Sequence, residues 1–226
     1  MQKRSHALLA SALLRCEGGF SARRYELAFL FGSFQPDCNY LSYLKGSLHH
    51  KKFGGHTYGN NRRFLEKRIR RLQKREKWNL WHYYTLGKLC HYVADAFTYP
   101  HNDHFPGKGW DHHTYEVALR LRLQEVLAGK ELSRRELSAD LTEDLARLHR
   151  HYMSGASGLD RDIRYILAAS ELLMSGCRPK EAALAEEEFL PVPDLLPLPE
   201  LLPTPGLTPV PVPVSRQEKR TPYNRG

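Results

Sequence analysis

Two pairs of histidine and carboxylate, each four residues apart, constrain the fold of this chain more than any other feature. His91 and Asp95 form the first pair, and His112 and Glu116 form the second. On an α-helix, side chains four residues apart project from one face, within reach of one ion. His101 lies between the pairs, just past the expected end of the first helix. The sequence H-x3-D-x5-H-x10-H-x3-E therefore gathers three imidazoles and two carboxylates within 26 residues.

This set of side chains predicts a zinc site. Zinc accepts imidazole nitrogen and carboxylate oxygen as ligands. One such pair is common in proteins that bind no metal, whereas two pairs on either side of a third histidine are a more specific signal. The four cysteines are scattered, with no C-x-x-C pair, so they offer neither a thiolate zinc site nor a dense disulfide framework.

The remaining pattern predicts helices nearly throughout and therefore an all-α, multi-helix bundle. Strand signals are weak, because no segment shows sustained alternation of apolar and polar residues. Ser5 is expected to cap the first helix and Gly32 to end the second, followed by a long loop over 33–59. The expected helices cover residues 5–14, 22–31, 60–76, 78–97, 111–127, 133–153 and 159–174.

Two features of the helix over 78–97 lead to further expectations. Gly87, four residues before His91, is expected to let a neighbouring backbone approach this helix. The aromatic side chains near its start are expected to pack in the core rather than to stack on bases; they are Trp78, Trp81, Tyr83 and Tyr84.

The net charge of +9 favours anionic partners, namely nucleic acid, a lipid surface or a phosphorylated small molecule. Residues 62–77 hold nine Lys or Arg against two Glu. Leu65, Ile69 and Leu72 give this segment a narrow apolar stripe, which indicates the solvated face of an ordinary bundle helix. The alternative is a peripheral contact with an anionic membrane or with nucleic acid.

The composition changes after residue 180. Nine of the 14 prolines lie between residues 191 and 213, and such a stretch favours polyproline II or disorder. We therefore predict a helical domain over 1–180 and a disordered proline-rich tail over 181–226. The alternative role for the tail is recruitment of a partner.

The first 16 residues faintly resemble a secretory or lipoprotein signal, with a basic start and an apolar run from Ala7 to Leu14. This run is short for a signal, and Arg15 occupies a position where a small residue is expected. No run approaches the length of a membrane span. The expectation is a cytoplasmic protein without a transmembrane segment, with export as the alternative.

The spacing of His91, Asp95, His101, His112 and Glu116 resembles the trinuclear zinc site of the bacterial zinc-dependent phospholipase C family, whose fold is shared with the S1/P1 nucleases. The resemblance implies an all-α bundle of that type. It also implies a zinc-dependent phosphoric ester hydrolase that uses water activated by several zinc ions, with phospholipid among its substrates.

The resemblance extends upstream. His6, at the head of an apolar helix, is similar to the N-terminal ligand histidine of the family. Asp37, in the segment G-S-F-Q-P-D, resembles the loop aspartate that ligates zinc and is a candidate catalytic base. A further loop histidine should follow, and His56 fits best, with His50 as the alternative.

Carried over to this chain, the resemblance implies two or three zinc ions. The first ion would take Asp37, His56, His91 and Asp95. The second, more open ion would take His101, His112 and Glu116. Asp95 would bridge to a third ion that also takes His6, and an amino terminus completes this third site in the family.

Two other functions remain open from the sequence. One is a nuclease that acts on single strands with the same metal site. The other is a metal-binding interaction protein without turnover, which would recruit partners through its proline-rich segment.

Overall fold

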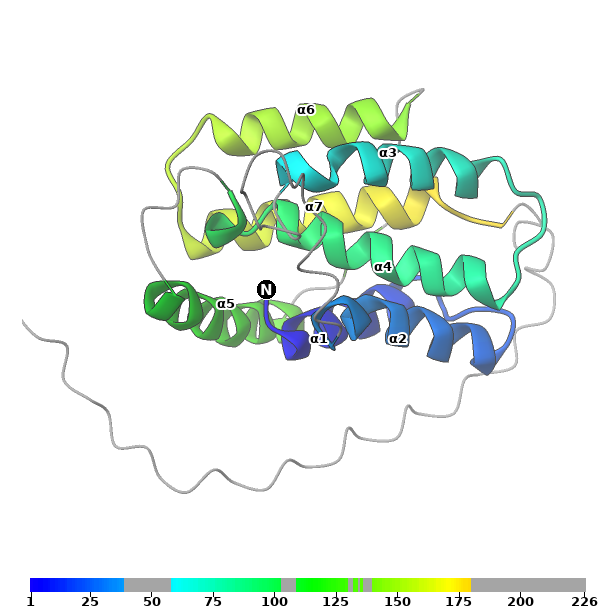
Figure 1. Cartoon of the computed structure of the whole chain (residues 1–226). Helices are drawn as coiled ribbons and strands as arrows, with labels where there is room; N and C mark the ends of the chain where they lie inside the picture. Colours follow the sequence, from blue (N-terminus) through cyan, green and yellow to red (C-terminus); the bar gives the residue numbers. More distant parts are fainter. Residues whose placement is uncertain (39–57, 103–108, 130–131, 134, 136–139, 180–226) are drawn as a thin grey trace, which may run out of the picture. The chain divides into compact units, whose positions relative to one another are not determined.

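The computed structural model describes residues 1–38, 58–102, 109–129, 132–133, 135 and 140–179 (Figure 1). All of them belong to one compact unit, Met1–Phe189. The second unit, Leu190–Gly226, lies outside the described residues. The structure also does not describe the tail predicted over 181–226, nor His50 and His56.

The all-α fold predicted from the sequence is confirmed, since the described residues form helices and no strand. None of these helices combines the length and the apolar character that crossing a bilayer requires. The helices are α1 (Lys3–Cys16), α2 (Arg23–Cys38), α3 (Tyr58–Gln73), α4 (Leu80–Ala96), the short 3-10 helix η3 (Tyr99–His101), α5 (Gly109–Gly129), α6 (Leu141–Met153) and α7 (Leu159–Gly176).

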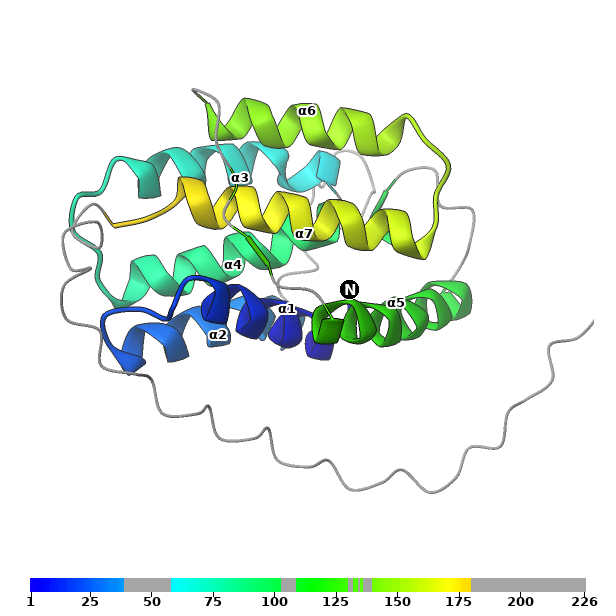
Figure 2. The same cartoon turned by 180° about the vertical axis from the view of Figure 1, so that it is seen from behind.

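Helix α4 is the centre of the bundle. It contacts α1, α2, α3 and α7, and its second half is buried almost without interruption. Figure 1 shows α1 and α2 on one side of α4 and α3 on the other. From behind, α7 runs between α6 and the pair formed by α1 and α5 (Figure 2). The polar ligand candidates of α4 therefore lie on a helix that is surrounded by other helices.

Helices α2 and α4 pack against each other at unusually close range through two glycines. A Cβ atom on Gly87 would lie 2.0 Å from the carbonyl oxygen of Phe29, and one on Gly32 would lie 2.2 Å from that of Tyr84. Neither position has room for a side chain. The expectation that Gly87 admits a neighbouring backbone is confirmed.

The predicted end of the second helix at Gly32 is wrong. Helix α2 continues to Cys38, with Pro36 inside its last turn. Gly32 serves close packing against α4 rather than helix termination, and this use depends on a partner that the local sequence does not show. As a result, Asp37 lies on the last turn of a helix and not in a loop.

The predicted cap at Ser5 is also wrong, because α1 begins at Lys3 and Ser5 is buried within it. The carbonyl oxygen of Gln2 accepts hydrogen bonds from the backbone N–H groups of Ser5 and His6. Gln2 is thus the N-cap residue. Because the helix starts this early, Met1 and His6 have fixed positions relative to each other.

The helix expected over 133–153 begins at Leu141 instead. Asp140 caps it, since its side chain accepts hydrogen bonds from the backbone N–H groups of Thr142 and Glu143. Upstream, the backbone N–H of Ser133 donates to the side chain of Glu171 on α7, 3.3 Å away. Ser133 is therefore held by a tertiary contact with α7.

The expectation that the aromatic residues near the start of α4 fill the core holds for Trp78 and Tyr83, which are buried. It is wrong for Trp81, whose surface is 70% exposed. Asn79 and His82 form a capping box that sets the first turn of α4. With the first turn fixed in this way, the side chain of Tyr83 points into the core and that of Trp81 points to solvent.

We predict that Gly87→Ala destabilises the protein by about 1–3 kcal/mol, because the new methyl group forces α2 and α4 apart. Gly59→Ala is the matched control, since a Cβ on Gly59 meets nothing within 4 Å. Denaturant unfolding of both variants tests this. Equal stability of the two variants would contradict the close contact.

Candidate metal centre

A first group of polar side chains comes from three helices. His6 (α1), His91 and Asp95 (α4) place one potential ligand atom each within 4.8 Å of one another. The two imidazole rings stack with their centroids 3.8 Å apart. Asp37 (α2) faces the same group, with its Oδ1 atom 3.6 Å from Nε2 of His91 and its Oδ2 atom 3.9 Å from Nε2 of His6.

The ring of His91 has a fixed orientation. Its Nδ1 atom lies 2.9 Å from the carbonyl oxygen of Ser33, which can only accept a hydrogen bond. The ring therefore carries a proton on Nδ1, and in the neutral ring Nε2 holds a lone pair. Nε2 faces Asp95 Oδ2 at 3.3 Å as well as Asp37. A ring nitrogen that faces two carboxylates at this range is placed as metal ligands are, so the arrangement fits a metal ion.

His6 supports the same interpretation. Burial, and then the neighbouring His91, lower its pKa to about 3, so the ring is neutral at ordinary pH. Its Nε2 atom is buried without a hydrogen-bond partner and lies 3.2 Å from Asp95 Oδ1. Neutral imidazole is the form that binds metals.

A second group consists of His101 from η3 and of His112 and Glu116 from α5. Glu116 Oε1 lies 3.1 Å from Nε2 of His101 and 3.0 Å from Nε2 of His112. Burial lowers the pKa of His101. Burial alone would raise the pKa of Glu116, but hydrogen bonds from both histidines hold it well below its usual value. This group is the more open one, because the side chain of His112 is 37% exposed.

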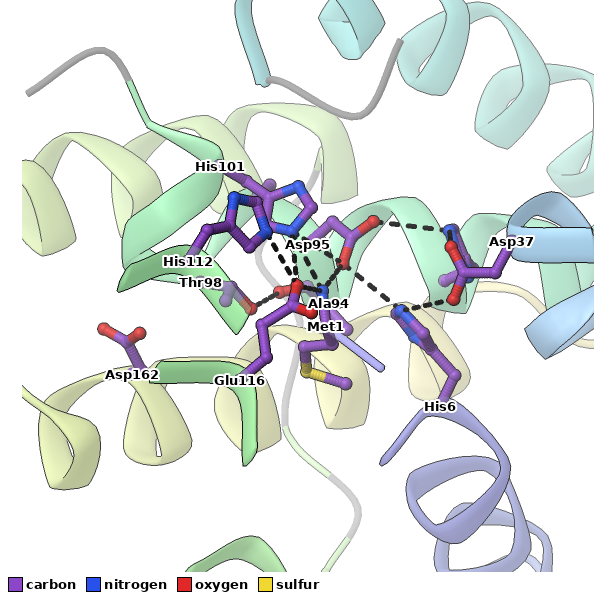
Figure 3. Close-up of polar contacts among 12 residues, drawn as sticks. Met1, His6, Asp37, Ala94, Asp95, Thr98, His101, His112, Glu116 and Asp162 are labelled. Atoms are coloured by element: carbon purple, nitrogen blue, oxygen red, sulfur yellow. Dashed lines mark hydrogen bonds and ion pairs between the residues drawn. The ribbon is translucent and has the colours of Figure 1, made fainter. Parts of the chain in front are cut away.

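The amino group of Met1 lies between the two groups (Figure 3). Its nitrogen is 2.6 Å from Asp95 Oδ1, 3.0 Å from His101 Nε2 and 3.0 Å from Glu116 Oε1. Burial by itself lowers the pKa of this amine, but Asp95 and Glu116 outweigh burial and raise it to about 10. The Met1 amine is therefore positively charged where it lies between the two groups.

Asp95 connects the two groups. Its Oδ1 atom faces the Met1 amine and His6, while Oδ2 faces His91. Burial alone would raise the pKa of Asp95, but His101, the Met1 amine and the other two histidines hold it well below its usual value. Asp95 is thus an ionised carboxylate with no exposed surface.

The turn that carries His101 is fixed by Asn102. The side-chain amide of Asn102 donates to the carbonyl oxygens of Ala96 and Thr98, at 3.1 and 3.0 Å, where α4 ends. His149 of α6 lies with its Nε2 atom 3.2 Å from the amide oxygen of Asn102. The bond to Ala96 gives a donor to one of the last carbonyl oxygens of α4, which have none within the helix.

Sequence reasoning missed Asp162, a fully buried carboxylate on the first turn of α7. It accepts hydrogen bonds from the backbone N–H of Tyr99 at 2.8 Å, from the Tyr115 hydroxyl at 2.9 Å and from the Tyr152 hydroxyl at 2.8 Å. Tyr99 lies on the same turn as His101, and Tyr115 directly precedes Glu116. Asp162 therefore fixes η3 and α5 relative to each other. Only its position in a helical first turn marked it in the sequence.

The structure thus brings seven of the eight ligand candidates into two groups around Asp95; these seven are His6, Asp37, His91, Asp95, His101, His112 and Glu116. His56 and its alternative His50 lie outside the described residues. The sequence resemblance assigned His6 to a separate third ion, whereas here its ring stacks on that of His91.

We predict that Asp162 makes stability depend on pH. Burial raises its pKa from 3.8 to about 6, against the opposing effect of its three hydrogen-bond donors and the Met1 amine. The folded protein then favours the protonated form, so stability falls by about 2 kcal/mol as the pH rises from 4 to 7. Asp162→Asn removes this titration and can still accept from Tyr99.

Denaturant unfolding of the wild type and of Asp162→Asn in the presence of chelator measures this. The stability of the variant relative to the wild type should rise by about 2 kcal/mol between pH 4 and pH 7. Asp162→Leu should be destabilised at every pH, since it leaves three donors without an acceptor. If the variant and the wild type differ in stability by the same amount at both pH values, the prediction is refuted.

Comparison with known proteins supports the same interpretation as the geometry of the two groups. The sequence model of the family described as zinc dependent phospholipase C matches residues 5–164. This range includes both groups of ligand candidates and Asp162. No curated protein and no solved structure matches the chain. Because the family match covers well over half of the 226 residues, the chain belongs to the zinc-dependent phospholipase C family.

Proposed function

We propose that this protein is a zinc-dependent hydrolase of phosphoric diesters, of the phospholipase C type, and that its two groups of side chains hold two or three zinc ions. The observation that carries the proposal is the position of His91 Nε2, which faces carboxylate oxygens of Asp95 and Asp37 at 3.3 and 3.6 Å. A bound cation would reconcile these three groups. Membership of a zinc-dependent family makes zinc the expected ion.

The first group would hold zinc through His6, His91, Asp95 and Asp37, and the second through His101, His112 and Glu116. All of these donors are nitrogen or oxygen, which suits zinc. The Met1 amine would have to give up its proton to join them, because only the neutral amine has a lone pair. Metal binding should therefore release protons.

When bound, zinc lowers the pKa of water and polarises the oxygens of a phosphoryl group. The chain itself would supply a proton acceptor. Asp37 suits this role, because its side chain keeps 10% of its surface exposed, whereas those of His6 and Asp95 have almost none. It would orient the attacking water and accept its proton as the new bond to phosphorus forms.

The substrate would approach from the side of the second group. His112 is the most exposed of its three residues, whereas His6 and His91 in the first group are almost fully buried. The water oxygen would form a bond to phosphorus, and the bond to the leaving alcohol oxygen would break. That alcohol would take up the proton held by Asp37, which yields a phosphomonoester and a free alcohol.

We predict that the purified protein contains two or three equivalents of zinc and that His91→Ala or Asp95→Ala removes most of it. Both variants should also melt at lower temperature, because the ions join segments far apart in the sequence. His113→Ala is the matched control, since His113 neighbours His112 but is exposed and belongs to neither group. Less than half an equivalent in the wild type, even after dialysis against zinc, would refute the metal sites.

We predict that Asp37→Asn lowers kcat by about 10²–10⁴-fold while it keeps more zinc than Asp95→Ala, because an amide oxygen can bind metal but accepts no proton. The substrates are a chromogenic phosphodiester, a short-chain phospholipid and a single-stranded oligonucleotide. Hydrolysis of the oligonucleotide alone would favour a nuclease. A zinc-loaded protein that cleaves none of the three would favour a metal-binding protein without turnover.

A further inference from the structure

An exposed apolar surface lies on the outer side of α2 and α4, away from the buried core. Leu27 and Phe31 of α2 are 55% and 52% exposed, and Leu80 and Trp81 open α4 with large exposed side chains. We call these four residues together with Tyr84 the aromatic patch. Exposed apolar residues scattered singly are normal, but a contiguous patch needs an explanation.

Tyr84 makes the patch continuous across the two helices. Its ring stacks on Phe31 with centroids 6.0 Å apart and meets Trp81 edge-on at 5.7 Å. The Tyr84 hydroxyl donates a hydrogen bond to Gln35 Oε1 at 2.9 Å. The close approach of α2 and α4 at Gly32 and Gly87 places these side chains next to each other. The patch is therefore built by tertiary packing and not by one helix alone.

Positively charged side chains accompany both helices of the patch. Lys88 lies with its Nζ atom 5.6 Å from the ring centre of Tyr84. Arg23 and Arg24 are exposed one turn before Leu27. Exposed Lys74, Arg75 and Lys77 precede α4 in the chain, with Glu76 as the one acidic residue among them. Burial and the charge of Arg75 together lower the pKa of His82, which is next to Trp81.

This combination suits one kind of partner. Tryptophan and tyrosine rings concentrate at the boundary between lipid and water, and lysine and arginine are attracted to anionic headgroups. We infer that the aromatic patch docks the protein on the surface of a bilayer that contains anionic phospholipid. The inference deepens the proposed function and rests on it for the choice of a phospholipid surface.

The position of the patch fits this role. Phe31 and Asp37 lie six residues apart on α2, or about 9 Å along the helix axis. Trp81 and Tyr84 lie on α4, which also carries His91 and Asp95. Docking through the first halves of α2 and α4 would therefore hold against the lipid the same two helices that carry Asp37, His91 and Asp95.

The test is cosedimentation with vesicles of phosphatidylcholine, with and without phosphatidylserine. The wild type should bind the anionic vesicles at least tenfold more tightly than the neutral ones, and added salt should weaken binding. A double variant, Phe31→Ser with Trp81→Ser, should bind the anionic vesicles at least tenfold more weakly. Leu121→Ser is the matched control, because Leu121 is an equally exposed apolar residue on α5, and it should bind like the wild type.

Circular dichroism and zinc content establish that the double variant is folded. Binding of the double variant equal to that of the wild type would overturn the inference. So would a wild type that ignores vesicles but binds a single-stranded oligonucleotide, or that self-associates through the patch.

The same samples separate this inference from the proposed function. Pelleted protein reports docking, whereas phosphorylated headgroup released into the supernatant reports hydrolysis. Docking through the patch without headgroup release would support the surface and count against the enzyme. Hydrolysis of a soluble phosphodiester by a protein that never pellets would support the enzyme and overturn the surface.

Discussion

The ionised carboxylate of Asp95, buried at the centre of a helical bundle, determines how the other parts of the structure are arranged. A carboxylate without exposed surface is unstable unless cations or donors surround it. Here the positively charged Met1 amine, 2.6 Å away, takes that role, while the imidazoles of His6 and His91 turn their Nε2 atoms toward the same carboxylate at 3.2 and 3.3 Å. They come from the start of the chain and from α1 and α4, while Asp37 adds α2. The groups that surround this one buried charge therefore come from the ends of several helices.

The part of the site that lies within single helices could be predicted from the sequence. The periodicity of the α-helix alone places His91 beside Asp95 and His112 beside Glu116, and both pairs lie together as expected. The all-α fold followed from the lack of strand patterns. The helix over 78–97 agrees with α4 to within two residues at each end.

The remaining features depend on contacts between distant segments, which local patterns do not contain. Glycine is typical of a helix end, yet Gly32 packs on the backbone at Tyr84 and α2 continues to Cys38. Asp162 is an ordinary first-turn acid until η3, α5 and α6 bring their donors to it. Trp81 is as apolar as Trp78 and Tyr83, and only packing against the other helices decides that those two are buried while Trp81 is exposed.

The different exposure of the two groups has a consequence for how the protein would work. The side chains of His6, His91 and Asp95 have almost no exposed surface, so an ion there could exchange only if α1, α2 and α4 separated. An ion held by His101, His112 and Glu116 would meet solvent through His112. Closed sites serve stability, whereas catalysis needs an open position. The first group would thus fix the bundle, and Asp95 would transmit that fixed geometry to the second group, where substrate enters.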